Sequence, residues 1–167
     1  MTDTVLIYGG SGGIGAAIAR KLAGEGRKPH LVGRNVDRLK QIAVETGARY
    51  TIADVEDAAS FMRVADEAGS ELAGLVYPAG TINLKPLARL TPADFERDFR
   101  INALGAALAV QAALPALKAH SGTSAVVLFS SVAARQGFTA HASISMAKGA
   151  VEGLTLALAA EIAPSFA

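Results

Sequence analysis

The stretch Thr4–Gly15, TVLIYGGSGGIG, joins a run of strand-forming residues to five glycines within seven positions. The run TVLIY has the length and composition of a buried strand. Glycine is a poor interior residue for a helix or a strand, because it loses much backbone freedom on folding. The residues from Ile14 to about Glu25 then have a helical pattern that ends in glycine. We therefore predict a strand, a tight turn and a helix at the start of the chain.

A glycine turn between a strand and a helix lets a ligand approach the backbone closely. A phosphate at a helix N-terminus meets unpaired N–H groups and the positive end of the helix dipole, and a β-carbon on the turn would keep it away. The alternative is a plain glycine-rich turn without a ligand. The position of Gly9–Gly15 at the first strand–helix junction favours dinucleotide binding.

Strand and helix patterns alternate along the rest of the chain. Further strands are predicted at 30–33, 49–53, 72–77 and 124–130, and further helices at 35–47, 57–69, 92–117 and 143–163. Strands that are apolar on both faces and separated by helices indicate a parallel sheet covered on both sides. Right-handed crossovers then favour an α/β fold with a Rossmann-like, doubly wound sheet of about five strands. We expect residues 1–167 to form a single nucleotide-binding domain.

The composition limits the classes of partner and location. The 167 residues carry a net charge of +1, with lysine and arginine scattered singly, so no basic face for nucleic acid is expected. The absence of cysteine excludes disulfides, cysteine-ligated zinc and a thiol nucleophile, and we expect no metal site. The N-terminus lacks the pattern of a signal peptide, and no apolar run approaches the ~18 residues of a membrane span. We expect a cytoplasmic protein with neither nucleic-acid nor membrane partners.

The spacing of the glycines points to one family. Gly9, Gly13 and Gly15 give G-x-x-x-G-x-G, which differs from the G-x-G-x-x-G dehydrogenase fingerprint. It resembles the T-G-x-x-x-G-I-G coenzyme loop of the short-chain dehydrogenase/reductase family, with Tyr8 at the threonine position. The resemblance covers essentially the whole chain. It implies an oxidoreductase that transfers a hydride between a nicotinamide coenzyme and a small carbonyl or secondary-alcohol substrate.

The second strand ends where this family selects its coenzyme. An NAD-dependent dehydrogenase usually has an acid there for the ribose hydroxyls, whereas this chain has Gly33 followed by Arg34. A guanidinium suits a 2′-phosphate, which favours NADP(H) over NAD(H), although Arg34 could also be an ordinary surface residue.

Further coenzyme contacts follow from the resemblance. Asp54-Val55 resembles the pair that contacts adenine, and Asp54 could equally be a turn residue. After the fourth strand the family has N-N-A-G, of which Ala79 and Gly80 remain, while Tyr77 replaces an asparagine and its hydroxyl needs a partner. The implied coenzyme contacts are Gly9, Ser11, Gly12, Gly13, Ile14, Gly15, Arg34, Asp54, Val55, Ala79, Gly80 and Lys148.

The resemblance implies four catalytic positions, of which one is altered. Ser131 matches the serine that binds the substrate oxygen, Asn102 the asparagine of the long helix, and Lys148 the lysine that holds the nicotinamide ribose. The catalytic tyrosine should stand four residues before Lys148, where the chain has Ile144. Isoleucine cannot transfer a proton, and loss of a general acid typically lowers the rate by about 10²- to 10⁴-fold.

No other residue is expected to take over this role. Tyr8, Tyr50 and Tyr77 lie in predicted strands, and His141 precedes the last helix. Ser143 and Ser145 point about 100° to either side of position 144 on that helix. Two hypotheses therefore stand: an NADP(H)-dependent oxidoreductase of doubtful activity, or an inactive relative that binds nucleotide or a partner.

The resemblance also concerns assembly. The family continues after the last predicted helix with two further strands and a lid, so here the fifth strand should form an open edge. The helices at 92–117 and 143–163 are rich in alanine, glycine and leucine. In this family the corresponding helices form the dimer contact, so we expect a homodimer or homotetramer through them.

Overall fold

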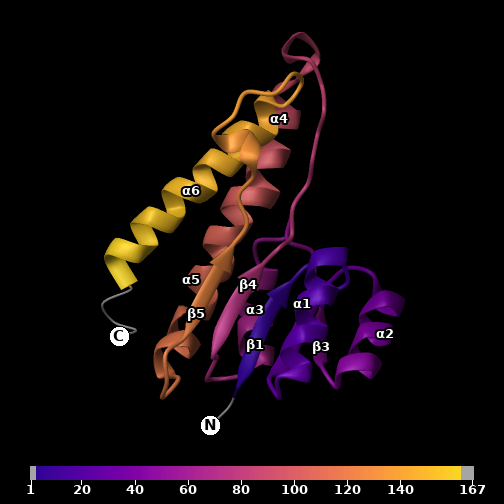
Figure 1. The fold of residues 1–167 in the computed structure, drawn as a ribbon, viewed down its shortest axis with the longest axis vertical. Helices are drawn as coiled ribbons and strands as arrows, with labels where there is room; N and C mark the ends of the chain where they lie inside the picture. Colours follow the sequence, from indigo (N-terminus) through magenta and orange to yellow (C-terminus); the bar gives the residue numbers. More distant parts are fainter. Residues whose placement is uncertain (1–2, 163–167) are drawn as a thin grey trace.

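The computed structural model describes residues 3–162, which contain a five-stranded, all-parallel sheet in the order β3-β2-β1-β4-β5 (Figure 1). The strands are β1 (Thr4–Tyr8), β2 (Lys28–Gly33), β3 (Arg49–Ile52), β4 (Gly74–Tyr77) and β5 (Ala125–Leu128). The chain runs from β1 outward to β3 and then returns to the other side of β1. The predicted doubly wound α/β fold is therefore confirmed, with its reversal of strand order between β1 and β4.

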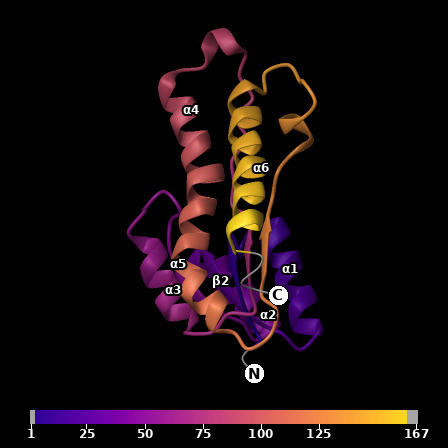
Figure 2. The same ribbon diagram turned by 90° about the vertical axis from the view of Figure 1, so that its left-hand side faces the viewer.

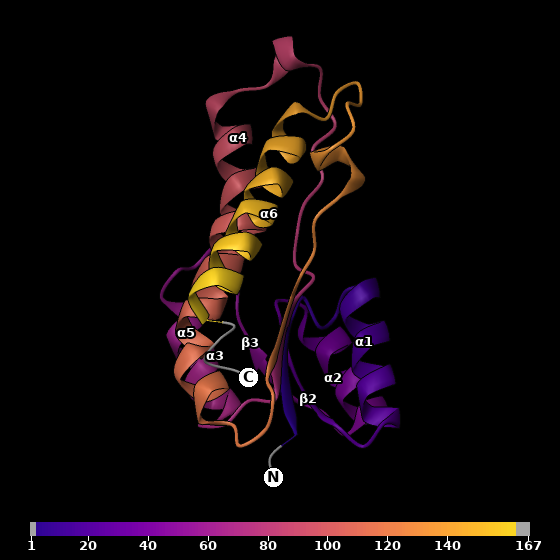
Figure 3. The same cartoon turned by 60° about the vertical axis from the view of Figure 1, so that its left-hand side comes forward.

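Helices cover both faces of the sheet, as Figure 3 shows. On one face lie α1 (Gly13–Gly24) and α2 (Val36–Thr46). On the other lie α3 (Ser60–Ala68), α4 (Pro92–Phe99), the π-helical turn η2 (Arg100–Leu104), α5 (Gly105–Ala119) and α6 (Ala142–Ile162). Two short 3₁₀ turns, η1 (Leu87–Arg89) and η3 (Val132–Ala134), lie in the loops before α4 and α6.

The buried core consists of two apolar layers, one on each side of the sheet. Leu6, Val32 and Leu75 pack under α3 and α5, and Ile7 and Leu31 pack under α1 and α2. Neighbouring residues of one strand thus face opposite layers, which explains why the strands are apolar on both faces.

Several element boundaries differ from the sequence prediction. The helix expected from 57 begins at Ser60, because the Asp57 carboxylate and carbonyl accept the amides of Ala59 and Ser60 in a turn. The strands expected at 72–77 and 124–130 shorten to 74–77 and 125–128. The last helix begins at Ala142, and residue 163 lies outside the described residues.

The predicted helix at 92–117 is one continuous helix from Pro92 to Ala119, with the π-helical turn inside it. It lies beside α6, and both project beyond the end of the sheet (Figure 2). Among residues 3–162 it is the one helix long and apolar enough to cross a membrane, but most of its apolar segment is buried inside the protein. It is therefore best described as the core helix of this face.

Strand β5 forms one edge of the sheet. Val126 and Leu128 pack towards the core under α5, whereas Val127 faces the other side and is 44% exposed. The open edge expected from the sequence is thus present within the described residues.

Candidate active site

The glycine loop between β1 and α1 is tightly folded. Gly9 has φ +68°, and its carbonyl accepts the amide of Gly12 at 2.9 Å. A β-carbon on Gly15 would overlap the Gly9 carbonyl oxygen. Gly9 and Gly15 are therefore required by the turn itself.

The next part of the loop, at the start of α1, has free backbone amides. Gly12 caps α1 without a side-chain bond, and the first turn carries no acid. Within the described residues, the amides of Gly13, Ile14 and Gly15 have no acceptor in the turn or at the cap. A β-carbon on Gly13 would meet no protein atom within 4 Å, so the fold does not itself require glycine there. Free amides beside open space fit a diphosphate at the helix N-terminus.

A cleft of about 280 Å³ opens above this loop at the carboxyl ends of the strands. Its walls come from the loops after β1, β2, β3 and β4 and from the long helix Pro92–Ala119. Gly9, Ser11, Gly12, Arg34, Asp54, Val55, Ala79 and Gly80 line it, together with Val32, Gly33, Ala53, Glu56, Pro78, Thr81, Arg97 and Ile101. This position, at the reversal of strand order, is where doubly wound sheets bind ligands.

Charged side chains surround the end of this cleft that is formed by the loops after β2 and β3. Arg34 Nη1 lies 3.4 Å from Asp54 Oδ2 and 3.9 Å from Glu56 Oε2. Arg97 of α4 donates to the other side of the Glu56 carboxylate, from Nε at 3.2 Å. Asp54 also accepts the amide of Glu56 at 3.0 Å, so it is a turn residue as well as part of the cleft wall.

The buried hydroxyl of Tyr77 finds its hydrogen-bond partner in the long helix Pro92–Ala119. The hydroxyl donates to the Ile101 carbonyl at 2.8 Å, and a β-carbon on Gly105 would overlap it. A side chain that inserts into the hydrogen-bond ladder of a helix is an identifiable cause of local distortion. We attribute η2 to Tyr77 on this ground. Burial also raises the pKa of Tyr77 far above its usual value, so the hydroxyl stays protonated as a donor.

Asn102, in the π-turn, is 1% exposed and fully bonded. Its Nδ2 donates to the Thr81 hydroxyl and to the Asp98 carbonyl, each at 2.9 Å. The Thr81 hydroxyl donates to the Asp98 carboxylate at 2.7 Å, and Ser143 of α6 donates to the same carboxylate at 2.6 Å. This buried network ties the loop after β4 to α4 and α6.

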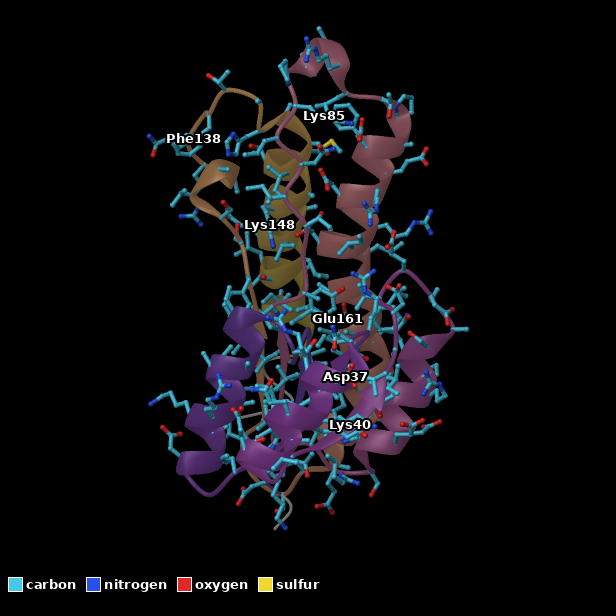
Figure 4. All side chains as sticks on the ribbon, turned by 90° about the vertical axis from the view of Figure 1, so that its right-hand side faces the viewer. Asp37, Lys40, Lys85, Phe138, Lys148 and Glu161 are labelled. Carbon is cyan, nitrogen blue, oxygen red and sulfur yellow. The ribbon has the colours of Figure 1, made fainter. Side chains whose placement is uncertain are left out.

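Lys148 lies close to Asn102 across the backbone of Gly80. A β-carbon on Gly80 would lie 2.6 Å from Asn102 Oδ1 and 3.5 Å from Lys148 Nζ. The ammonium group donates to the Phe129 carbonyl at 2.8 Å, and burial lowers the pKa of Lys148. Figure 4 shows Lys148 on α6, between the level of Asp37 and Lys40 in α2 and the upper loops that carry Lys85 and Phe138.

Three further predicted positions, Ser131, Ile144 and Ile14, do not line the cleft. The Ser131 hydroxyl caps η3 by accepting the amide of Ala133 at 3.2 Å. Ile144 is 3% exposed and contributes no polar atom. Ile14 is 55% exposed at the start of α1. A further hollow, lined by Leu87, Phe138 and Ser145 among others, lies between η1, the loop after η3 and the start of α6.

The sequence reading missed Asp98, Thr81, Glu56 and Arg97. One signal was available for Asp98, which stands four residues before Asn102 and therefore on the same buried helix face. Thr81, Glu56 and Arg97 come together only through the topology, and no local pattern indicates them.

The fold and the glycine loop define a Rossmann-type α/β chain, and comparisons with known proteins specify its family. Residues 3–165 match the short chain dehydrogenase family. The L-2,3-butanediol dehydrogenase of Corynebacterium glutamicum is 33% identical over 98% of this chain and 67% of its own length. A 3-dehydrosphinganine reductase of Arabidopsis thaliana is 33% identical over 93% of this chain and 50% of its own length.

A solved structure agrees with these relatives. A short-chain dehydrogenase from Shigella flexneri complexed with NADP superimposes with a TM-score of 0.87 and 28% identity, over 95% of this chain and 71% of that one. The present chain thus belongs to the short-chain dehydrogenase family. It spans from about half to about two thirds of the length of the curated relatives it matches.

Proposed function

We propose that this chain binds a nicotinamide dinucleotide, NADP(H) in preference to NAD(H), in the cleft above the glycine loop. The observation that carries the proposal is the set of free amides at the start of α1, beside an open Gly13. These amides would hold the diphosphate. Arg34 would face the 2′-phosphate, Asp54 and Val55 the adenine, and the Ala79-Gly80 backbone a ribose.

The reaction we assign to this site is hydride transfer with a carbonyl or secondary-alcohol substrate, at a rate strongly limited by Ile144. The coenzyme supplies or accepts the hydride when bound. Lys148 would hold the nicotinamide ribose, and Ser131 would bind the substrate oxygen. Asn102 would hold the Gly80 backbone in position beside Lys148. The proton on the substrate oxygen has no donor among these residues.

Ser143 does not supply the missing proton. Its side chain is fully buried and already donates to the Asp98 carboxylate. A second candidate function is therefore nucleotide binding without turnover. The specific observation in its favour is the buried, apolar Ile144 at the tyrosine position.

Restoring the tyrosine separates the two functions. NADPH binding is measured first by fluorescence titration, and turnover is then measured with a panel of ketones. We expect Ile144→Tyr to raise turnover by about 10²- to 10⁴-fold with little change in coenzyme affinity. Binding without turnover in either variant would favour the non-catalytic function, and absence of binding in both would contradict the proposed function itself.

We also propose that the chain self-associates through α4–α5 and α6, which lie side by side. Large apolar side chains on these helices are exposed: Phe99, Leu104, Met146 and Leu156. We expect Leu156→Glu to shift the sedimentation coefficient to that of a monomer, because a charge would be buried in the interface. Val44→Glu, at an exposed position of α2, is the matched control. A wild-type chain that sediments as a monomer would contradict this proposal.

A further inference from the structure

The adenosine end of the cleft holds two acids against the arginine expected to bind a 2′-phosphate. Asp54 and Glu56 both lie within 4 Å of Arg34 Nη1. A 2′-phosphate would compete with these carboxylates for the same guanidinium, since all three are anions. Arg34 can therefore bind a 2′-phosphate only in competition with these two acids.

The two acids are not equivalent. Asp54 lies two residues after the end of β3 and accepts the Glu56 amide, so the turn fixes its position in the cleft wall. The Glu56 side chain is about as exposed as that of Asp54, 32% against 38%, but within the described residues the hydrogen bonds to its carboxylate come from Arg97 and not from the turn. Its carboxylate is instead positioned by another element of the fold.

Arg97 provides that positioning. It reaches Glu56 from α4 with two nitrogens, Nε to Oε1 at 3.2 Å and Nη2 to Oε2 at 3.5 Å. The same carboxylate raises the pKa of Arg97. Glu56 thus lies between two arginines from different sides of the cleft, with its shorter contacts to Arg97 and its longer contact to Arg34.

We infer that Glu56 is a specificity-determining residue that opposes 2′-phosphorylated coenzyme by occupying Arg34, and that Arg97 holds it in this place. The inference rests on the proposed coenzyme binding. Binding of NADPH requires Glu56 to give up Arg34 and to keep only its contacts with Arg97. NADH makes no such demand, because its ribose carries no 2′-phosphate.

The test is the ratio of the dissociation constants for NADPH and NADH, measured by calorimetry. Glu56→Gln removes the charge but keeps the length of the side chain and an acceptor for Arg97. We expect NADPH to bind about two- to fivefold more tightly, as for a partly exposed charge pair, with NADH unchanged. Glu25→Gln removes the same charge at the far end of α1, where Glu25 pairs with Lys21, and should leave the ratio unchanged.

A second background tests the route through Arg34. In an Arg34→Gln chain, Glu56→Gln should no longer improve NADPH binding by this factor, because the contested guanidinium is gone. An equal improvement in both backgrounds, or an unchanged ratio in Glu56→Gln, would overturn the inference while coenzyme binding itself stands. If the wild-type chain binds neither coenzyme, the proposed function fails and the inference fails with it. Titration with 2′,5′-ADP and 5′-ADP repeats the comparison without the nicotinamide half of the ligand.

Discussion

His30 shows how a single buried side chain makes the stability of this fold depend on pH. It is 2% exposed on β2, and its Nε2 lies 2.9 Å from the Thr51 hydroxyl, which donates to Glu67. The hydroxyl must therefore accept from Nε2–H, which leaves Nδ1 unprotonated and without a hydrogen-bond partner in the described chain. Burial, with a smaller contribution from Arg49 and against the opposing effect of Glu67, lowers the pKa of His30 to about 4.

This shift predicts acid destabilisation. The folded pKa lies below the ordinary value of about 6.5, so the unfolded chain binds more protons between these two values. The part of the free energy of unfolding that depends on neutral His30 is fully present above about pH 6.5 and is lost as the pH falls towards 4. We expect the free energy of unfolding to fall by about 2 kcal/mol from pH 7 to pH 5 through His30 alone.

The measurement is urea denaturation at both pH values, with His30→Gln as the matched control. Glutamine can still bond Thr51 but does not titrate, so the variant should lack this part of the pH dependence. An identical pH dependence in the two proteins would show that His30 does not titrate in this way.

At the scale of the element, the long helix on one face of the sheet is shaped by a strand residue. Tyr77 is the last residue of β4, and its hydroxyl lies against Gly105 and donates to the carbonyl of Ile101. The resulting π-turn carries Asn102, which bonds the loop after β4. A substitution at Tyr77 in β4 should therefore shift Asn102, because the π-turn lies between them.

We expect Gly105→Ala to destabilise the fold by about 2–3 kcal/mol, because its β-carbon would overlap the Tyr77 hydroxyl. In a Tyr77→Phe background the same change should cost about 1 kcal/mol less. Gly24→Ala, in a helix position with open space, should instead be neutral or slightly stabilising. Chemical denaturation of the four-member cycle checks this, and additive effects would exclude the coupling.

Sequence patterns predicted the elements better than their details. The order and type of the five strands and their helices follow from apolar runs and glycine turns, since these are local signals. The π-turn does not, because it depends on Tyr77 meeting a helix 24 residues further along. The bonds of Asp98 to Thr81 and Ser143 likewise join segments 17 and 45 residues apart. The later start of α3 is a local effect of the Asp57 turn that the pattern did not resolve.

At the scale of the whole molecule, the two halves of the site differ. The half proposed to bind the nucleotide has a glycine loop and a cleft with charged side chains, at the ends of four neighbouring strands. In the half proposed to bind the substrate, Asn102 and Lys148 lie close to the Gly80 backbone, Ser131 caps η3, and the proposed position of the proton donor holds the buried Ile144. The architecture thus supports coenzyme binding more strongly than turnover.

The central claim, that the amides at the start of α1 receive a coenzyme diphosphate, is tested most directly at Gly13. Its β-carbon would meet no protein atom, so Gly13→Ala should fold with equal or slightly higher stability. The same methyl group would stand where the diphosphate approaches the helix. Calorimetric titration with NADPH should give binding to the wild-type chain and a loss of at least about tenfold in the variant. Equal affinity of the two folded proteins for NADPH, or no binding by either, would contradict the claim.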